Sequence, residues 1–236
     1  MSGDGDSESG GRSNNRQFDK DWLYDEMGFD EDLLSMRKRY IDFDDEDEKR
    51  VMRMTPVFER IQDDLADEFY DKLLVYNETA DVISDTDVTV DQLKETQKRY
   101  LLSLGNYGYE PGDGAGYGES YAKSRLAIGH MHVLIGLTPP WYIGAYSVYH
   151  DMILEELFED TYDKMRRHHD IDEEAFDELD ELREDILAYL RLVNFDMQLA
   201  IDTYLHRMVA QSSGNARHET TDKGSSIVER ISGMFG

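Results

Sequence analysis

The feature that most constrains the fold is an apolar stripe that repeats every three or four residues from Glu173 to about Gln211. This spacing places the stripe on one side of an α-helix, and no Gly or Pro interrupts it. Its members are Phe176, Leu179, Leu182, Ile186, Leu190, Val193, Met197, Ile201, Tyr204 and Met208. Shorter stripes with the same period occupy four other segments, 57–76, 90–104, 120–136 and 141–167. No segment shows the two-residue alternation of a strand, so an all-α fold is predicted.

Charge narrows the possible partners. The chain has 52 acidic and 25 basic residues, which gives a formal net charge of −27. Such a surface repels phosphate groups, so nucleic acid and anionic membranes are expected to be poor partners. The same self-repulsion destabilises a compact fold unless salt screens it, and the screening length falls to roughly 3 Å at 1 M salt. We therefore expect a halophilic source, and the alternative is simply an acidic, soluble protein.

The apolar residues form neither a signal peptide nor a transmembrane segment. The N-terminal residues MSGDGDSESGG are acidic and contain no apolar core, so they do not resemble a signal peptide. The longest apolar region, Val133–Tyr146, is interrupted by two prolines and is too short to span a bilayer. A cytoplasmic protein without direct membrane insertion is predicted.

Two histidines lie close together in the segment 125–146. On a helix that turns about 100° per residue, His132 falls in an apolar sector with Ile128, whereas His130 points to the opposite side. Gly136 follows where a helix end favours glycine. From these residues alone, His132 is either a core histidine bonded to a carbonyl group or a metal ligand.

A longer pattern surrounds His132 and resembles a known family. The pattern R-x-x-I-G-x-x-H-x-x-x-G-L-x-P-x-W-Y is formed by Arg125, Ile128, Gly129, His132, Gly136, Leu137, Pro139, Trp141 and Tyr142. It resembles the proximal region of globin-coupled sensors, in particular the haem-based aerotaxis transducers. The resemblance implies a globin fold with an extra N-terminal helix and a long C-terminal helix, and it implies that His132 ligates haem iron. Since the chain contains no cysteine, the haem would be haem b without a thiolate ligand or covalent attachment.

The helix predicted at 57–76 contains the segment D-E-F-Y-D-K-L, in which Tyr70 flanks the apolar stripe. By itself, Tyr70 fits a half-buried aromatic residue whose hydroxyl reaches water. The resemblance implies instead that Tyr70 donates a hydrogen bond to oxygen on the distal side of the haem. Three further residues are expected to contact the haem: Phe69, Ile128 and Tyr142, the last of which could sense strain on His132.

The helix predicted at 90–104 carries L-K-E-T-Q-K-R, which resembles the distal helix of the same family. The resemblance implies that Leu93 and Thr96 line the oxygen pocket. The alternative is a surface helix in which Thr96 bonds back to its own turn. This helix contains no histidine, so the distal histidine of many oxygen-storage globins has no counterpart here.

The expected function is that of a haem-dependent oxygen sensor, with carbon monoxide and nitric oxide as other possible ligands. The resemblance implies a homodimer in which the last two helices form a four-helix bundle. The output would be a transducer module or a separate signalling partner. The alternative is a stand-alone globin with haem-based redox activity towards oxygen, nitric oxide or peroxide. No hydrolase motif is present, so the chain itself is not expected to be an enzyme.

The predicted organisation is a single domain between two tails. Residues 1–17 read as a disordered acidic tail, 18–211 as the globin sensor domain and 212–236 as a flexible C-terminal tail. One or two short helices are expected between Phe18 and Phe43, and an Asp- and Thr-rich loop at 84–89.

Overall fold

The computed structural model describes residues 19–106, 116–167 and 173–212, and the regular elements in these ranges are all helices. In order, they are α2 (Lys20–Glu26), α3 (Glu31–Tyr40), α4 (Asp45–Arg53), α5 (Thr55–Val75), α6 (Asn77–Ser84), α7 (Val90–Asn106), α8 (Glu119–Leu134), α9 (Pro139–Arg167) and α10 (Glu173–Ser212). The predicted all-α class is confirmed. The predicted tails, 1–17 and 212–236, lie outside the described residues, apart from Ser212 at the end of α10.

Aspartates begin the short helices at the N-terminal end. The side chains of Asp19, Asp30 and Asp44 accept hydrogen bonds from backbone N–H groups in the first turns of α2, α3 and α4. These caps satisfy donors that a helix start leaves unpaired, and the carboxylates stabilise its positive end. Helices α2 and α3 pack against α8. The chain thus carries the predicted extra helical segment ahead of the main bundle.

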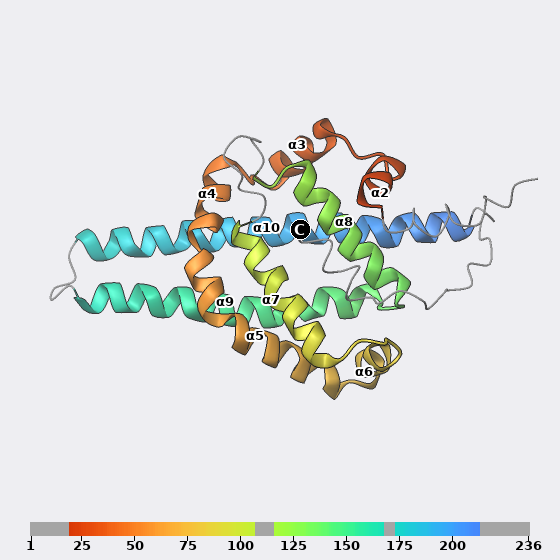
Figure 1. Ribbon diagram of the computed structural model, residues 1–236. Coiled ribbons are helices and arrows are strands. Elements are labelled where there is room, and N and C mark those ends of the chain that lie inside the picture. The colour runs from red at the N-terminus through yellow and green to blue at the C-terminus, as the bar shows by residue number, and fades with distance from the viewer. Residues whose placement is uncertain (1–18, 107–115, 168–172, 213–236) are drawn as a thin grey trace, which may run out of the picture.

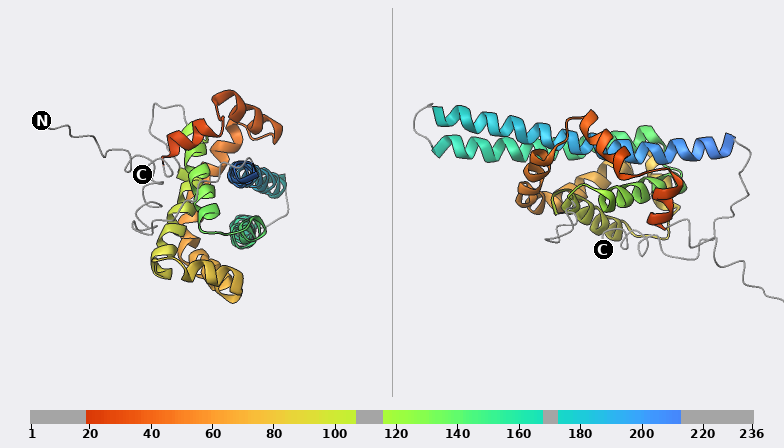
Figure 2. Two further views of the ribbon diagram at one scale, coloured as in Figure 1. Left: turned by 90° about the vertical axis from the view of Figure 1, so that its right-hand side faces the viewer. Right: turned by 90° about the horizontal axis from the view of Figure 1, so that it is seen from above.

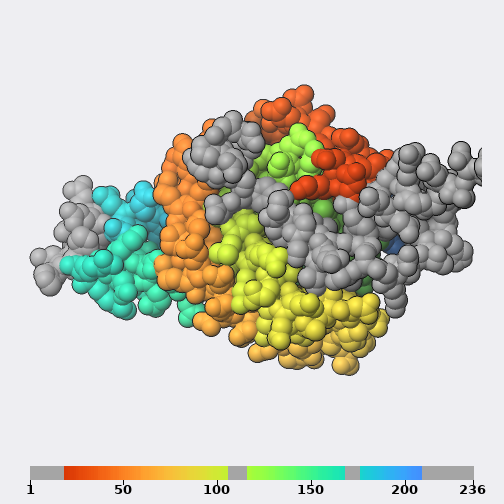
Figure 3. Space-filling view, in the orientation of Figure 1, coloured from red at the N-terminus to blue at the C-terminus, as the bar shows by residue number. Residues whose placement is uncertain are grey.

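Helices α9 and α10 form the longest pair. They run side by side in opposite directions, and the ends where one leads into the other project beyond the remaining helices (Figure 1). Figure 2 shows both helices end-on, to one side of the rest of the bundle. In the space-filling view the projecting part stands clear of the other described helices (Figure 3).

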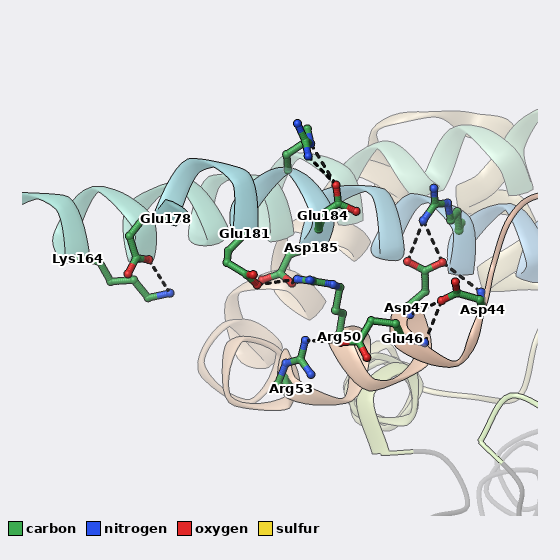
Figure 4. A network of polar contacts seen from close by, with 12 residues as sticks. Asp44, Glu46, Asp47, Arg50, Arg53, Lys164, Glu178, Glu181, Glu184 and Asp185 are labelled. Atoms are coloured by element: carbon green, nitrogen blue, oxygen red, sulfur yellow. Dashed lines mark hydrogen bonds and ion pairs between the residues drawn. The ribbon is translucent and has the colours of Figure 1, made fainter. Parts of the chain in front are cut away.

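Ion pairs join α4 to α10 (Figure 4). Arg50 lies 2.8 Å from a carboxylate oxygen of Glu181 and 3.1 Å from one of Asp185. Arg191 contacts the two carboxylate oxygens of Asp47 at 2.9 and 3.0 Å. The carboxylate of Glu181 is exposed, so its pair with Arg50 contributes only about 0–1 kcal/mol. Asp47 is buried, so its pairing with Arg191 offsets the cost of burying that carboxylate.

Glycines mark the closest helix crossings. A Cβ atom added at Gly129 in α8 would lie 2.8 Å from Ala200 Cα and 2.9 Å from Thr203 Oγ1 in α10. A Cβ atom at Gly105 in α7 would lie 2.6 Å from Thr55 Oγ1 at the start of α5. At Gly129 the obstacle is backbone, so a larger residue requires α10 to move, whereas at Gly105 the Thr55 side chain would have to shift.

The connection between α8 and α9 follows the sequence prediction. Gly136 has a φ of +82°, the left-handed conformation that favours glycine just after a helix end. Pro139 then begins α9, where a missing N–H costs no hydrogen bond.

Helix α6 was not predicted from the sequence. It has only eight residues, and its first turn has no side-chain cap. Isolated helices of this length are unstable, so α6 depends on packing against α5. Among the described helices, none combines the length and the low polarity needed to cross a membrane.

Candidate functional site

A cavity lies between five helices, α5 to α9, and every site residue predicted from the sequence borders it. The predicted residues are Phe69, Tyr70, Leu93, Thr96, Ile128, His132 and Tyr142. They come from four different helices and span more than seventy positions of the chain. The fold therefore brings the predicted proximal and distal residues together at one place, and the remaining question is what each can do there.

His132 presents one ring nitrogen to this cavity. Its Nδ1 lies 2.8 Å from the carbonyl oxygen of Ile128, one helical turn earlier. A carbonyl can only accept, so Nδ1 carries the proton and donates it. In the neutral ring Nε2 is then unprotonated, and among the described residues it has no hydrogen-bond partner. Burial lowers the pKa of His132, and the bond to Ile128 opposes this only in part, so the neutral ring is favoured.

Tyr70 places a hydroxyl group in the same cavity. The residue is buried in α5, and no hydrogen bond joins its hydroxyl to another described residue. Burial raises the pKa of Tyr70 well above its ordinary value, so the hydroxyl keeps its proton. Tyr70 is thus a neutral donor whose hydrogen-bonding capacity is unused within the described chain.

Thr96 differs from Tyr70 in this respect. Its hydroxyl donates to the carbonyl oxygen of Gln92 at a distance of 3.1 Å, which is the back-bonding arrangement considered for a plain helix residue. Thr96 nevertheless lines the cavity together with Leu93. Both interpretations of Thr96 therefore hold at once: it borders the pocket, but its only hydroxyl proton is already used.

Tyr142 links His132 to a row of tyrosines. Its ring packs edge-on against the imidazole, with 5.1 Å between the ring centroids. Its hydroxyl lies 3.3 Å from that of Tyr146, and the Tyr146 hydroxyl lies 3.0 Å from that of Tyr100. Burial raises the pKa of Tyr142 to about 12, so this hydroxyl also stays protonated.

A buried ion pair completes this row. Tyr100 donates to Asp196 Oδ2 at 2.9 Å, and Tyr121 donates to the other oxygen, Oδ1. Arg125 Nε lies 3.5 Å from Oδ2, and its guanidinium group sits 4.5 and 4.4 Å from the ring centroids of Tyr100 and Tyr121. Burial raises the pKa of Asp196, while Arg125 and the two hydroxyls act in the opposite direction. Because every neighbour of the carboxyl group is a donor, we treat Asp196 as ionised.

Several cavity residues were not predicted from the sequence. Helix α6 contributes Thr79, Val82 and Ile83. Gln97 and Tyr149 also border the cavity, and the Gln97 amide donates to the Tyr149 hydroxyl. Tyr146 and Tyr149 follow Tyr142 at helical spacing, a signal that could have indicated them. Nothing in the local pattern indicated Gln97 or α6.

His130 lies away from the cavity, as the helix geometry predicted. Its neighbours on α10 include His206 and Arg207, and its Nε2 is buried without a hydrogen-bond partner among the described residues. Burial first, and then the proximity of Arg207 and His206, lower the pKa of His130 to about 4. His130 therefore does not take part in the cavity.

The cavity chemistry fits a flat, largely apolar group that carries a metal. Most lining side chains are aliphatic or aromatic, and one imidazole nitrogen and one free hydroxyl face the space. Within the described ranges no three His, Asp or Glu side chains gather as a metal cage. His132 offers one nitrogen that could ligate the metal of such a group.

The chain is similar in sequence and in fold to known proteins. The Protoglobin family model matches residues 30–209. The heme-based aerotactic transducer HemAT of Halobacterium salinarum is 37% identical over 183 residues, which cover 78% of this chain and 35% of that protein. The chain thus spans about a third of the length of that relative.

A solved structure supports the fold. The globin domain of the Geobacter sulfurreducens globin-coupled sensor superposes with a TM-score of 0.56 and 24% identity, over 72% of this chain and 96% of that one. At this identity the likeness demonstrates a shared fold. The Protoglobin family model matches most of the chain, so the chain belongs to the Protoglobin family.

Proposed function

We propose that the cavity binds haem b through His132 and that the domain is an oxygen sensor. One observation carries the proposal: an unprotonated imidazole nitrogen and an unused tyrosyl hydroxyl border the same largely apolar cavity. The haem-based relative of known function is consistent with it. When bound, haem b supplies a ferrous iron at which oxygen binds reversibly.

In this proposal the chain's own residues perform three tasks. Phe69, Ile128 and Tyr142 bury the apolar faces of the cofactor and exclude water. His132 supplies the axial nitrogen, and the Ile128 carbonyl holds its ring orientation. Tyr70 donates a hydrogen bond to the distal ligand, with Leu93 and Thr96 forming the rest of that wall.

The polarity of the ligand decides how much Tyr70 contributes. Oxygen bound to ferrous iron carries partial negative charge, and hydrogen bonds to charged groups stabilise by about 1.5–3 kcal/mol. That energy corresponds to about ten- to a hundredfold in affinity. Carbon monoxide is less polar and should gain less, so Tyr70 would favour oxygen.

The test is the absorption spectrum and ligand kinetics of the purified full chain. We expect a haem Soret band that shifts with oxygen. Tyr70→Phe should speed oxygen release about ten- to a hundredfold and carbon monoxide release much less. Absence of a haem band would overturn cofactor binding, and equal acceleration for both gases would overturn the role of Tyr70.

We further propose that the domain senses its ligand without turning it over. The similar proteins that support this are a transducer and a sensor domain. Steady-state consumption of oxygen, nitric oxide or peroxide, measured with a reductase, should stay at the level of free haem. Sustained turnover would favour the alternative of a redox globin.

A homodimer through α9 and α10 is part of the proposal. Five large apolar residues are exposed on α9 and α10 between positions 158 and 187: Phe158, Tyr162, Phe176, Leu179 and Leu187. Phe176 is the most exposed of them, at 62%. Joining two such pairs would form a four-helix bundle and bury these side chains.

Light scattering of Leu179→Asp tests the dimer. We expect this variant to be monomeric at concentrations where the unmodified chain is a dimer. Met36→Asp provides the control, because Met36 is also exposed but lies on α3. Equal masses for both variants would contradict an interface on α9 and α10.

The output and surroundings of the domain complete the proposal. The similar transducer is much longer than this chain, so we propose signalling to a transducer module or to a separate partner, as in aerotaxis. We also propose a cytoplasm of high salt, in which the net charge of −27 is screened.

A further inference from the structure

A chain of tyrosyl hydroxyls runs from the cavity to α10. It starts at Tyr142 beside His132 and passes through Tyr146 and Tyr100 to Asp196, with oxygen–oxygen distances of 3.3, 3.0 and 2.9 Å. All three tyrosines border the cavity, whereas Asp196 is buried in α10. The chain is thus a polar connection between the cavity wall and the long C-terminal helix.

The carboxylate determines the direction of every donor in this chain. Ionised Asp196 cannot donate, so the single hydroxyl proton of Tyr100 is used on it. Tyr146 must then be the donor towards Tyr100, and Tyr142 the donor towards Tyr146. The Tyr142 proton consequently points to the Tyr146 hydroxyl, because Asp196 accepts at the other end.

We propose that Asp196 is a positioning residue of the cavity: through Tyr100 and Tyr146 it holds Tyr142 as a hydrogen-bond donor to Tyr146, beside the His132 ring. Any effect of this arrangement on gas sensing rests on the proposed function. The series of hydroxyl hydrogen bonds does not depend on that proposal. Coupling between sites is reciprocal. An event in the cavity that turns the Tyr142 hydroxyl away from Tyr146 therefore breaks the Tyr142–Tyr146 hydrogen bond. That bond is the first of the series that ends at Asp196 on α10.

The other oxygen of Asp196 offers a matched control. Tyr121 donates to Oδ1, and Tyr121 packs against Phe195 and Tyr117 instead of bordering the cavity. Tyr121→Phe and Tyr146→Phe therefore both remove one buried tyrosyl hydroxyl. Only the second interrupts the connection to Tyr142.

Replacing Asp196 by Asn should reverse the donor direction of these hydroxyl hydrogen bonds. The side-chain amide of Asn can donate to Tyr100, which frees Tyr100 to donate to Tyr146 and Tyr146 to donate to Tyr142. Tyr142 would then change from donor to acceptor. Tyr146→Phe would instead leave the Tyr142 hydroxyl without its acceptor.

Ultraviolet resonance Raman spectra of the full chain test these states and need no haem. The chain has 15 tyrosines, so each protein is compared with the same protein carrying Tyr142→Phe, and the difference isolates residue 142. We expect the tyrosine doublet of residue 142 to indicate a donor in the unmodified chain and in Tyr121→Phe. It should indicate an acceptor in Asp196→Asn and a hydroxyl without its acceptor in Tyr146→Phe.

The second readout is carbon monoxide release from the haem-loaded chain. Asp196→Asn and Tyr146→Phe should change this rate on the order of two- to tenfold, the effect of one neutral hydrogen bond, and Tyr121→Phe should leave it unchanged. An unaltered residue-142 spectrum in Tyr146→Phe, or the same alteration in Tyr121→Phe, would overturn the inference. Tyr146→Phe keeps the buried ion pair, so it decides the matter if Asp196→Asn does not fold. A failure to bind haem would contradict the proposed function alone, because the Raman result stands without it.

Discussion

The two faces of α8 each carry a histidine, and burial favours the neutral form of both imidazoles. On the cavity face, His132 uses one nitrogen within its own helix and leaves the other open to the cavity. On the face towards α10, His130 is buried near His206 and Arg207, and its pKa falls to about 4. A neutral imidazole alone therefore does not make a ligand site. A ligand site also needs an adjoining cavity, and of these two histidines only His132 borders one.

The packing of the two faces differs in the same way. At Gly129, α8 approaches α10 so closely that a single added carbon would meet Ala200 and Thr203. At Ile128 and His132, the side chains of α8 face a cavity instead. One face is closed to hold the fold together, and the other remains open to receive a ligand.

The largest expected effect separates the two histidines. His132→Ala should lose haem or leave it without a normal axial ligand, because no other imidazole borders the cavity among the described residues. His130→Ala should retain a normal spectrum. Absorption spectra of the ferrous carbon monoxide forms provide the measurement. A normal spectrum for His132→Ala would contradict the role of His132 as the axial ligand.

A smaller effect concerns the closed face. Gly129→Ala should lower the free energy of unfolding by about 1–3 kcal/mol, the usual cost of overpacking a core. Gly144→Ala is the control, since Gly144 is exposed in α9 and an added Cβ would have nothing within 4 Å. It should instead stabilise the helix by about 1 kcal/mol. Urea unfolding of both variants measures the difference, and equal shifts would contradict the tight crossing.

The dependence of stability on pH tests the environment of His130. At pH values above 6.5 this ring is neutral in both the folded and the unfolded chain. As the pH falls, the unfolded chain takes up the proton first, so folding loses stability until the pH reaches the folded pKa of about 4. Because the ring keeps some contact with solvent, we expect a loss of about 1–2 kcal/mol.

His130→Gln should remove this part of the acid sensitivity. The measurement is the free energy of unfolding at several pH values for the haem-loaded chain and the variant. Parallel curves for the two proteins would show that His130 is solvated as in the unfolded chain.

The smallest expected effect concerns a cavity hydroxyl whose proton is already used in a hydrogen bond within its own helix. Thr96→Val removes a hydroxyl whose proton is already donated to Gln92, so oxygen release should change less than about threefold. Tyr70→Phe provides the comparison. Stopped-flow release of oxygen is the measurement, and a change as large as that for Tyr70→Phe would mean that the Thr96 hydroxyl turns to the ligand.

The sequence by itself was sufficient for the five longest described helices and for the principal cavity residues. Apolar periodicity is a local property of the chain, so it predicted α5, α7, α8, α9 and α10 and placed His132 and His130 on opposite sides of one helix. The family pattern then indicated Tyr70 and Thr96 as cavity residues, and both border the cavity.

Only the tertiary structure decided which groups meet across helices. Arg125 and Asp196 are far apart in the chain, and their pairing depends on where α8 crosses α10 at Gly129. The same holds for Gln97 with Tyr149, and for α6, which is too short to be stable without α5. The physical reason is that local periodicity specifies which side of a helix is buried. The crossing point of two helices, and hence every hydrogen bond between them, is set by how all the buried sides pack together.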